Sequence, residues 1–192
     1  MRIGFALCGS FCTFSQVFPV MEQLAREHQL IPIFSPVSYT TDSRFGTAQE
    51  HIRQASNICG RDPLCTIAQV EPIGPKKLLD ALIIAPCTGN TLAKLAHGIA
   101  DTSVTMAAKS HLRNGRPLVI AVSTNDALCG AAENIGRLLA RKHYYFVPFG
   151  QDDPVGKPRS LVADFDKIPA ALSAALAGAQ IQPMLYGNLK KG

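Results

Sequence analysis

The chain lacks tryptophan, and it lacks any apolar run long enough to span a membrane. The apolar segment that begins at Ile3 is short, and polar Ser10, Thr13 and Ser15 follow it without a convincing signal-peptide cleavage site. These absences argue against a membrane protein and against a secreted one. We therefore expect a cytoplasmic protein that has no membrane partner.

Metal-binding motifs are also missing. The chain has no Cys-x-x-Cys pair, and no histidines stand at the spacing typical of zinc ligands. The cysteines are Cys8, Cys12, Cys59, Cys65, Cys87 and Cys129. We expect no metal site, and free thiols that mostly pack as small apolar side chains. Cys87 is left open, because it lies in a polar loop.

A dense basic stripe is the third absence. The chain has 19 Lys and Arg against 14 Asp and Glu, which gives a net charge of +5. These basic residues are scattered, with small clusters at 76–77, 137–142 and 190–191. Nucleic-acid binders more often carry a continuous basic patch with interleaved aromatic residues. No nucleic-acid partner is expected, whereas the basic excess is compatible with an anionic small-molecule ligand.

What the sequence does contain is an alternation of apolar runs and amphipathic segments. The runs expected as strands are 2–7, 30–34, 65–70, 81–85, 117–122 and 144–148. The segments expected as helices are 14–27, 45–58, 91–98, 102–112, 131–141 and 166–177. Strands that are apolar throughout are typical of a parallel sheet covered on both faces. The pattern predicts a single-domain α/β three-layer sandwich with a parallel six-stranded sheet over 1–178, and an arm or disordered tail over 179–192.

Ligands of such sheets bind at the carboxyl ends of the strands, so the residues after each strand are informative. Gly9-Ser10 follows the first strand and precedes a helix N-terminus that favours phosphate, although the full dinucleotide fingerprint and the Walker lysine motif are missing. A long loop over 35–46 follows the second strand. Its Arg44 is suited to bind a carboxylate, or alternatively to pair with Asp42.

Two further strand ends carry polar groups. The segment Pro-Cys-Thr-Gly-Asn-Thr at 86–91 follows a buried strand, where Pro86 is expected to stop the strand and Asn90 to cap the next helix. The segment Ser-Thr-Asn-Asp at 123–126 follows the next strand and is equally explained as a helix-capping segment. Each strand end alone has a structural explanation. The coincidence of four polar strand ends predicts a ligand site.

Through Gly9-Ser10, 86–91 and the small residues of 96–101, the chain resembles the flavoprotein family of homo-oligomeric flavin-containing decarboxylases. In that family a Pro-Ala-Ser-Ala-Asn-Thr segment touches FMN and helps to form a trimer. This chain keeps the proline, the asparagine and the last threonine, and has Cys-Thr-Gly between them. The resemblance implies a Rossmann-like or flavodoxin-like fold, FMN as cofactor, and a homo-oligomer that is a trimer or a multiple of trimers.

Longer segments are similar to the dipicolinate synthase B subunits of spore-forming bacteria. The similarity covers nearly the whole chain and is carried by residues 41–46, 74–77, 84–91, 112–117, 123–128 and 146–152. It implies a subunit that works in the cytoplasm of the mother cell during sporulation, alongside an NAD(P)-binding A subunit. The implied reaction oxidises a dihydrodipicolinate to the aromatic dipicolinate.

One segment departs from the decarboxylases. They carry Pro-x-Met-Asn-x-x-Met-Trp where residues 122–129 read Val-Ser-Thr-Asn-Asp-Ala-Leu-Cys, so that Asn125 alone is retained. Those enzymes also use a catalytic histidine, for which His51 is the nearest by chain order. Decarboxylation is therefore not carried over. Two alternatives stay open: a non-catalytic subunit that activates the A subunit, and an FMN-dependent decarboxylase with altered motifs.

Oxidation of a dihydropyridine requires a hydride acceptor, a base and partners for two carboxylates. We expect Arg44 to bind a substrate carboxylate. The catalytic candidates are Asn125, Asp126 and His51, of which Asp126 and His51 are alternative bases. The expected FMN contacts are Gly9, Ser10, Ser35, Pro86, Cys87, Thr88, Asn90, Ser123, Thr124 and Asn125. Those of the first two strand ends are expected at the phosphate or ribityl chain, and Thr88, Asn90 and Asn125 near the ring.

Overall fold

The centre of the molecule is a parallel sheet in a computed structural model that describes residues 1–188. Its parallel strands are β1 (Arg2–Leu7), β2 (Gln29–Phe34), β3 (Ala81–Cys87), β4 (Leu118–Thr124) and β5 (Tyr144–Phe146). The order is β2-β1-β3-β4, and β5 pairs with β4. All seven residues of β3 are buried. This is expected for a central strand that helices cover on both faces.

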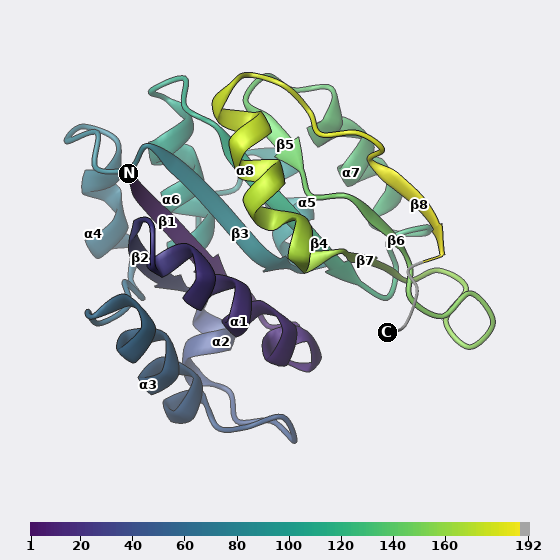
Figure 1. The fold of residues 1–192 in the computed structure, drawn as a ribbon, viewed down its shortest axis with the longest axis horizontal. Coiled ribbons are helices and arrows are strands. Elements are labelled where there is room, and N and C mark those ends of the chain that lie inside the picture. Colours follow the sequence, from purple (N-terminus) through teal and green to yellow (C-terminus); the bar gives the residue numbers. More distant parts are fainter. Residues whose placement is uncertain (189–192) are drawn as a thin grey trace.

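Helices cover both faces of the sheet (Figure 1). They are α1 (Phe14–Ala25), α2 (Pro36–Thr40), α3 (Ala48–Cys59), α4 (Ile67–Val70), α5 (Gly89–His97), α6 (Ser103–Leu112), α7 (Ala132–Leu139) and α8 (Ile168–Leu176), with single 3-10 turns at Phe11–Thr13, Glu71–Ile73 and Phe165–Lys167. Helices α1 and α8 lie on one face, and α5, α6 and α7 on the other. The predicted three-layer α/β sandwich is confirmed.

The sheet continues beyond β4 through three short strands. The second half of β4 pairs antiparallel with β7 (Leu161–Ala163), which pairs antiparallel with β6 (Phe149–Gln151), and β8 (Leu185–Asn188) lies beside β6. The first half of β4 pairs with β5 instead, so β4 has two partners along one side. The expected parallel six-stranded sheet is therefore corrected to five parallel strands with an antiparallel extension.

The segment 65–70, predicted as a strand, contains the short helix α4 over residues 67–70 instead. Thr66 Oγ1 accepts a hydrogen bond from the Gln69 backbone N–H (3.3 Å), and Gln69 Oε1 accepts one from the Thr66 N–H (3.0 Å). This capping box begins α4 at Ile67. Local capping therefore outweighs the apolar character that suggested a strand.

The boundary between β3 and α5 also differs from the prediction. Pro86 does not end the strand, because β3 continues to Cys87 through a register shift between Ile84 and Cys87. At such a shift no ladder bond needs the N–H that proline lacks. Asn90 is not the helix cap, because α5 begins at Gly89 with Thr88 as its N-cap.

The C-terminal part holds more structure than the sequence indicated. The predicted strand 144–148 ends at Phe146, and the loop expected from residue 150 begins instead after Gln151, the last residue of β6. Residues 185–188 of the expected tail form β8, whereas 189–192 lie outside the described residues. The domain limit at 178 stays a prediction. Within residues 1–188, no helix combines the length and apolarity that crossing a bilayer requires.

Candidate functional site

The carboxyl ends of β1, β3 and β4 meet at one edge of the sheet. The chain leaves β1 for β2 on one side and returns to β3 on the other, so the strand order reverses at β1. Such a reversal is where ligands of open α/β sheets bind. The hydroxyls of Ser10, after β1, and Ser123, near the end of β4, are 2.8 Å apart. The structure thus brings two predicted site residues from distant parts of the chain into contact.

The loops after β3 and β4 approach each other closely at Gly89. A Cβ atom on this residue would lie 2.8 Å from both Thr124 Oγ1 and Asp126 Oδ1. Thr124 Oγ1 donates to Asp126 Oδ1 over 2.5 Å, which fixes the carboxylate beside the N-terminus of α5. The side chains of Asn90 and Asn125 are exposed nearby in the chain and have no hydrogen-bond partner within residues 1–188.

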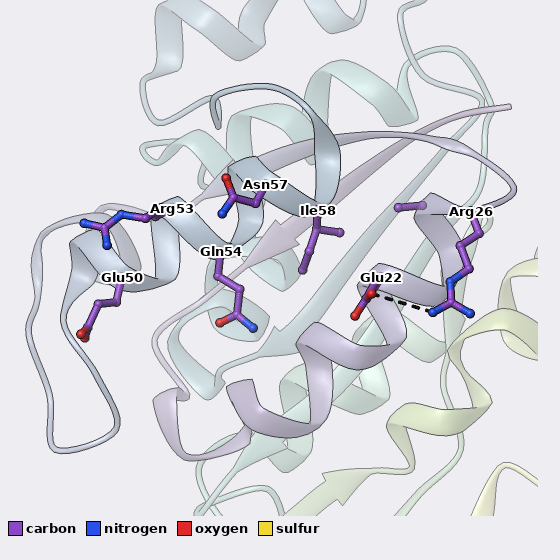
Figure 2. Close-up of a pocket in the computed structure, with 8 residues that line it drawn as sticks. Glu22, Arg26, Glu50, Arg53, Gln54, Asn57 and Ile58 are labelled. Atoms are coloured by element: carbon purple, nitrogen blue, oxygen red, sulfur yellow. Dashed lines mark ion pairs between the residues drawn. The ribbon is translucent and has the colours of Figure 1, made fainter.

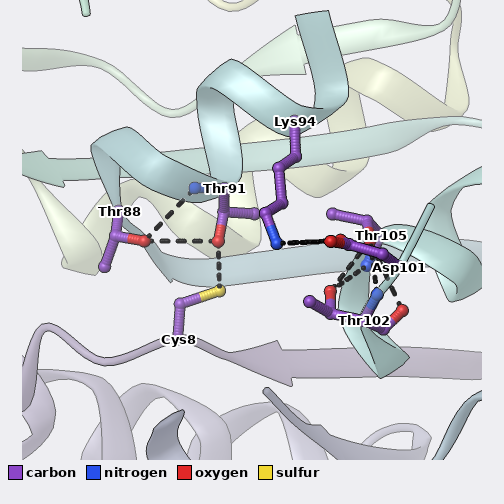
Figure 3. Close-up of polar contacts among 7 residues, drawn as sticks. All are labelled: Cys8, Thr88, Thr91, Lys94, Asp101, Thr102 and Thr105. Carbon is purple, nitrogen blue, oxygen red and sulfur yellow. Dashed lines mark hydrogen bonds and ion pairs between the residues drawn. The ribbon is translucent and has the colours of Figure 1, made fainter. Parts of the chain in front are cut away.

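A chain of hydrogen bonds leads from the start of α5 to a buried thiol (Figure 3). Thr88 Oγ1 donates to Thr91 Oγ1 (3.2 Å), which donates to Cys8 Sγ (3.3 Å). Burial raises the pKa of Cys8 to about 11 and that of Cys87 well above its usual range, where the nearby Cys8 raises it further. Both thiols therefore stay protonated at neutral pH and pack as apolar groups.

The far end of α5 has a structural explanation. Gly98 adopts a left-handed conformation (φ 71°) that ends the helix, and Lys94 Nζ pairs with Asp101 Oδ1 over 2.8 Å (Figure 3). Hydrogen bonds from Lys94 lower the pKa of the Asp101 carboxyl. Thr102 then caps α6. The small residues of 96–101 thus shape a helix–helix turn.

Residues after β2 are engaged within the protein. Ser35 is buried, and its hydroxyl accepts from the Ser38 N–H (3.2 Å) and bonds the Ser38 hydroxyl (2.9 Å) as the N-cap of α2. A Cβ on Gly9 would lie 2.7 Å from Val37 Cγ1, so Gly9 allows α2 to pack against the end of β1. Gly9, Ser10 and Ser35 are the residues expected at the phosphate. Of these, Ser10 has a hydroxyl on a partly exposed residue at the edge of the sheet.

Arg44 and His51 lie apart from the residues after β4. The Arg44 guanidinium is 4.8 Å from the centre of the Phe45 ring, and Asp42 accepts from the Ala48 N–H (2.8 Å) instead of pairing with it. His51 is buried, with Nε2 3.2 Å from the Phe45 carbonyl oxygen. Two strands, β1 and β3, separate β2 from β4. The structure therefore does not join these two candidates to Asn125 and Asp126.

A cleft of about 1170 Å³ opens beside the end of β4. Ser123, Thr124 and Asn125 line one wall, and the segments before and after β7 line another, including Lys157 and Ser160. Sequence reasoning missed this second wall. The signal available was the Asp-, Pro- and Gly-rich stretch 150–159, which reads as an exposed loop.

A second hollow, of about 650 Å³, lies between α1 and α3 (Figure 2). Arg26 pairs with Glu22 over 3.8 Å, and Glu50 completes the capping box of α3 with Thr47. These charged groups serve the helices themselves. None of the predicted site residues lines this hollow. The candidate site is therefore the edge of the sheet and not the hollow.

Three comparisons relate the chain to known proteins. It matches the family model described as Flavoprotein over residues 1–129. The dipicolinate synthase B subunit of Bacillus subtilis (strain 168) is 44% identical over 188 residues, which is 97% of this chain and 94% of that protein. The crystal structure of the dipicolinate synthase B subunit from Bacillus halodurans superposes with a TM-score of 0.89 at 43% identity, and the match covers 98% of this chain and 97% of that one.

More distant structures share the fold. DmrB of Burkholderia xenovorans in complex with FMN gives a TM-score of 0.68 at 19% identity, over 92% of this chain and 95% of that one. The family model covers most of the chain, and the two dipicolinate synthase relatives cover nearly all of it. This chain therefore belongs to the flavoprotein family, in the group of the dipicolinate synthase B subunits.

Proposed function

We propose that the chain is the B subunit of a dipicolinate synthase that binds FMN and oxidises a dihydrodipicolinate to dipicolinate with an NAD(P)-binding A subunit. The carrying observation is the meeting of three strand ends, where Ser10 bonds Ser123 and Gly89 lies against Thr124 and Asp126. The similarity to dipicolinate synthase B subunits supports the substrate.

The groups at this edge fit a flavin. Hydroxyls of Ser10 and Ser123, together with the N-terminus of the nine-residue α5, suit phosphate and ribityl oxygens. The amides of Asn90 and Asn125 are exposed and free of protein partners within residues 1–188, so they are available to the polar edge of the ring. When bound, a flavin supplies a two-electron acceptor for the hydride that the substrate loses.

The second requirement is a base. The substrate loses a hydride and a proton, and its ring becomes aromatic, so the residue that takes the proton must reach the ring carbon. Asp126 is exposed at the edge, and Thr124 orients it by donating to Oδ1. Its Oδ2 has no hydrogen-bond partner within residues 1–188 and can therefore accept the proton and return it to solvent. His51 is buried against the Phe45 carbonyl, so the geometry favours Asp126.

The first test is a titration of the purified chain with FMN, followed by flavin fluorescence, with riboflavin as the control. Saturable quenching by FMN and not by riboflavin is expected, because the phosphate contributes to binding. Turnover of dihydrodipicolinate with the A subunit then tests the reaction. Carbon dioxide release from a peptidyl-cysteine substrate would instead identify a decarboxylase.

One observation favours a second candidate, an activating subunit without chemistry of its own. The hydroxyls of Ser35 and Thr88 and the thiol of Cys8 are all engaged within the protein. No binding at tens of micromolar FMN, together with activation of the A subunit, would support this candidate. The hydride would then pass directly to the nicotinamide of the partner.

A further inference from the structure

The proposed substrate carries two carboxylates, and the proposed base is itself an anion. A dianion placed beside Asp126 needs a cation on the same side of the sheet. Arg44 follows β2, and β1 and β3 lie between β2 and β4. The edge at β4 therefore requires a second cationic residue.

We propose that Arg159 binds a carboxylate of the substrate beside Asp126, an inference that rests on the proposed function. The Arg159 carbonyl oxygen accepts from the Leu128 N–H (3.0 Å), and Arg159 Nη1 donates to Cys129 Sγ (3.5 Å). The Cys129 N–H in turn donates to the Asp126 carbonyl oxygen (2.9 Å). The guanidinium thus lies against the same turn that carries the base.

The guanidinium of Arg159 is available to a ligand. Its protein partner is an exposed thiol, and sulfur is a weak acceptor. None of the ion pairs within residues 1–188 includes Arg159, whereas Lys157 pairs with Asp152 (3.2 Å) and Arg137 with Glu133 (2.6 Å). An arginine presents a planar fork of donors that matches a carboxylate in two parallel hydrogen bonds.

The loop that presents Arg159 is held by its own hydrogen bonds. Asp153 accepts from the Gly156 N–H at Oδ1 (2.9 Å) and from the Lys157 N–H at its carbonyl (2.8 Å). Gln151 Nε2 donates to the Pro158 carbonyl (2.9 Å), and Ser160 is buried. The backbone that carries Arg159 therefore loses little conformational freedom on binding, which favours affinity.

The experiment is calorimetric titration of the full chain with pyridine-2,6-dicarboxylate and with pyridine-2-carboxylate, each with and without saturating FMN. Binding of the dicarboxylate either with or without FMN is sufficient for the comparison between variants. The variants are R159Q and R159K, and the matched control is R137Q, which removes an exposed arginine that already has a carboxylate partner. Urea unfolding of each variant checks that the fold is retained.

We expect R159Q to bind the dicarboxylate about tenfold to a hundredfold more weakly than the wild type, since it loses a charge-assisted pair. Its preference for the dicarboxylate over the monocarboxylate should fall in parallel. The dicarboxylate affinity of R159K should lie between those of R159Q and the wild type, because lysine keeps the positive charge but lacks the planar fork of donors. The affinity of R137Q should match that of the wild type.

Two failures are distinguishable. Dicarboxylate affinity in R159Q equal to that of the wild type would overturn the role of Arg159 and leave the proposed function standing. A wild-type chain that binds FMN but neither acid would overturn both the role of Arg159 and the proposed substrate.

Discussion

At the scale of single residues, Gly89 shows how the lack of a side chain shapes the site. A Cβ there would stand 2.8 Å from Thr124 Oγ1 and Asp126 Oδ1, so a methyl group must displace one of them. We expect G89A to weaken FMN binding and to lower the free energy of unfolding by about 1–3 kcal/mol, the usual cost of overpacking. Flavin fluorescence and urea unfolding measure the two effects.

The matched control for this substitution is G136A. Gly136 lies inside α7, and a Cβ there would meet no atom within 4 Å. Alanine should raise stability by about 0.5–1 kcal/mol, because glycine is unfavourable in a helix. If G89A and G136A behave alike, the close approach of the two loops has no role in the site.

His111 predicts a pH dependence of stability. It is fully buried, with Nε2 3.0 Å from the Pro117 carbonyl oxygen, and burial lowers its pKa from 6.5 to about 4. Between these values the unfolded chain takes up a proton that the folded chain does not. The free energy of unfolding should therefore fall as pH drops through this window, by up to about 3 kcal/mol in total.

The variant H111Q separates this effect from other titrations. Glutamine keeps an N–H donor for the Pro117 carbonyl but does not titrate. Urea unfolding across the window from about pH 7 to 4 should show a smaller slope for H111Q than for the wild type. Equal slopes would assign the acid sensitivity to other groups.

Single residues also show what the sequence can and cannot predict about the site. The position of Ser10, Ser123 and Thr124 at one edge of the sheet could be predicted because they follow or end buried strands, whereas their role in binding stays a prediction. The inward-facing hydroxyl of Ser35 could not, because its partner Ser38 belongs to a short helix that the sequence did not indicate. Arg159, which we propose as a carboxylate ligand, could not be predicted because its position depends on the antiparallel return of the chain.

At the scale of elements, α5 begins at the site and depends on its cap. Thr88 Oγ1 accepts from the Thr91 N–H over 3.5 Å and satisfies one of the free donors of the first turn. We expect T88A to lower the free energy of unfolding by about 1 kcal/mol, whereas T88S keeps the hydroxyl and most of the stability. Urea unfolding compares the two, and equal losses would show that the cap contributes nothing.

The elements of the parallel centre were predictable because their strands are apolar throughout. The antiparallel extension was not, because β6 and β7 have three residues each and their pairing is set by tertiary contacts. The strand prediction for residues 65–70 was wrong for a local reason. Its Ile67 and Val70 suggest a strand, but Thr66 and Gln69 close a capping box that starts a helical turn.

At the scale of the whole molecule, the surface after β2 predicts self-association. Val37, Tyr39 and Phe45 are 50%, 44% and 46% exposed, so three large exposed apolar side chains follow one another within a short stretch of the chain. Exposed apolar groups that gather in this way mark interaction sites. We expect a trimer or a multiple of trimers in light scattering of the purified chain, with Y39S and F45S shifting it toward smaller species.

The matched control for this prediction is V155S. Val155 is 93% exposed at a loop after β6, away from the stretch that follows β2. Its replacement should leave the molar mass unchanged. A wild-type chain that scatters as a monomer at micromolar concentration would contradict the prediction.

Because β4 pairs with both β5 and β7, the order in which the strands are synthesised determines when the cleft is complete. Synthesis proceeds from the N-terminus, so β1, β2, β3 and β4 leave the ribosome before β7 exists to pair with Ser123 and Thr124. The wall that carries Lys157 and Ser160, followed by Tyr186 of β8, is therefore the last part of the cleft to form. A nascent chain can bury its core early while its cleft is still open on one side. We therefore expect the cleft to bind a ligand only after β7 and β8 have joined the sheet.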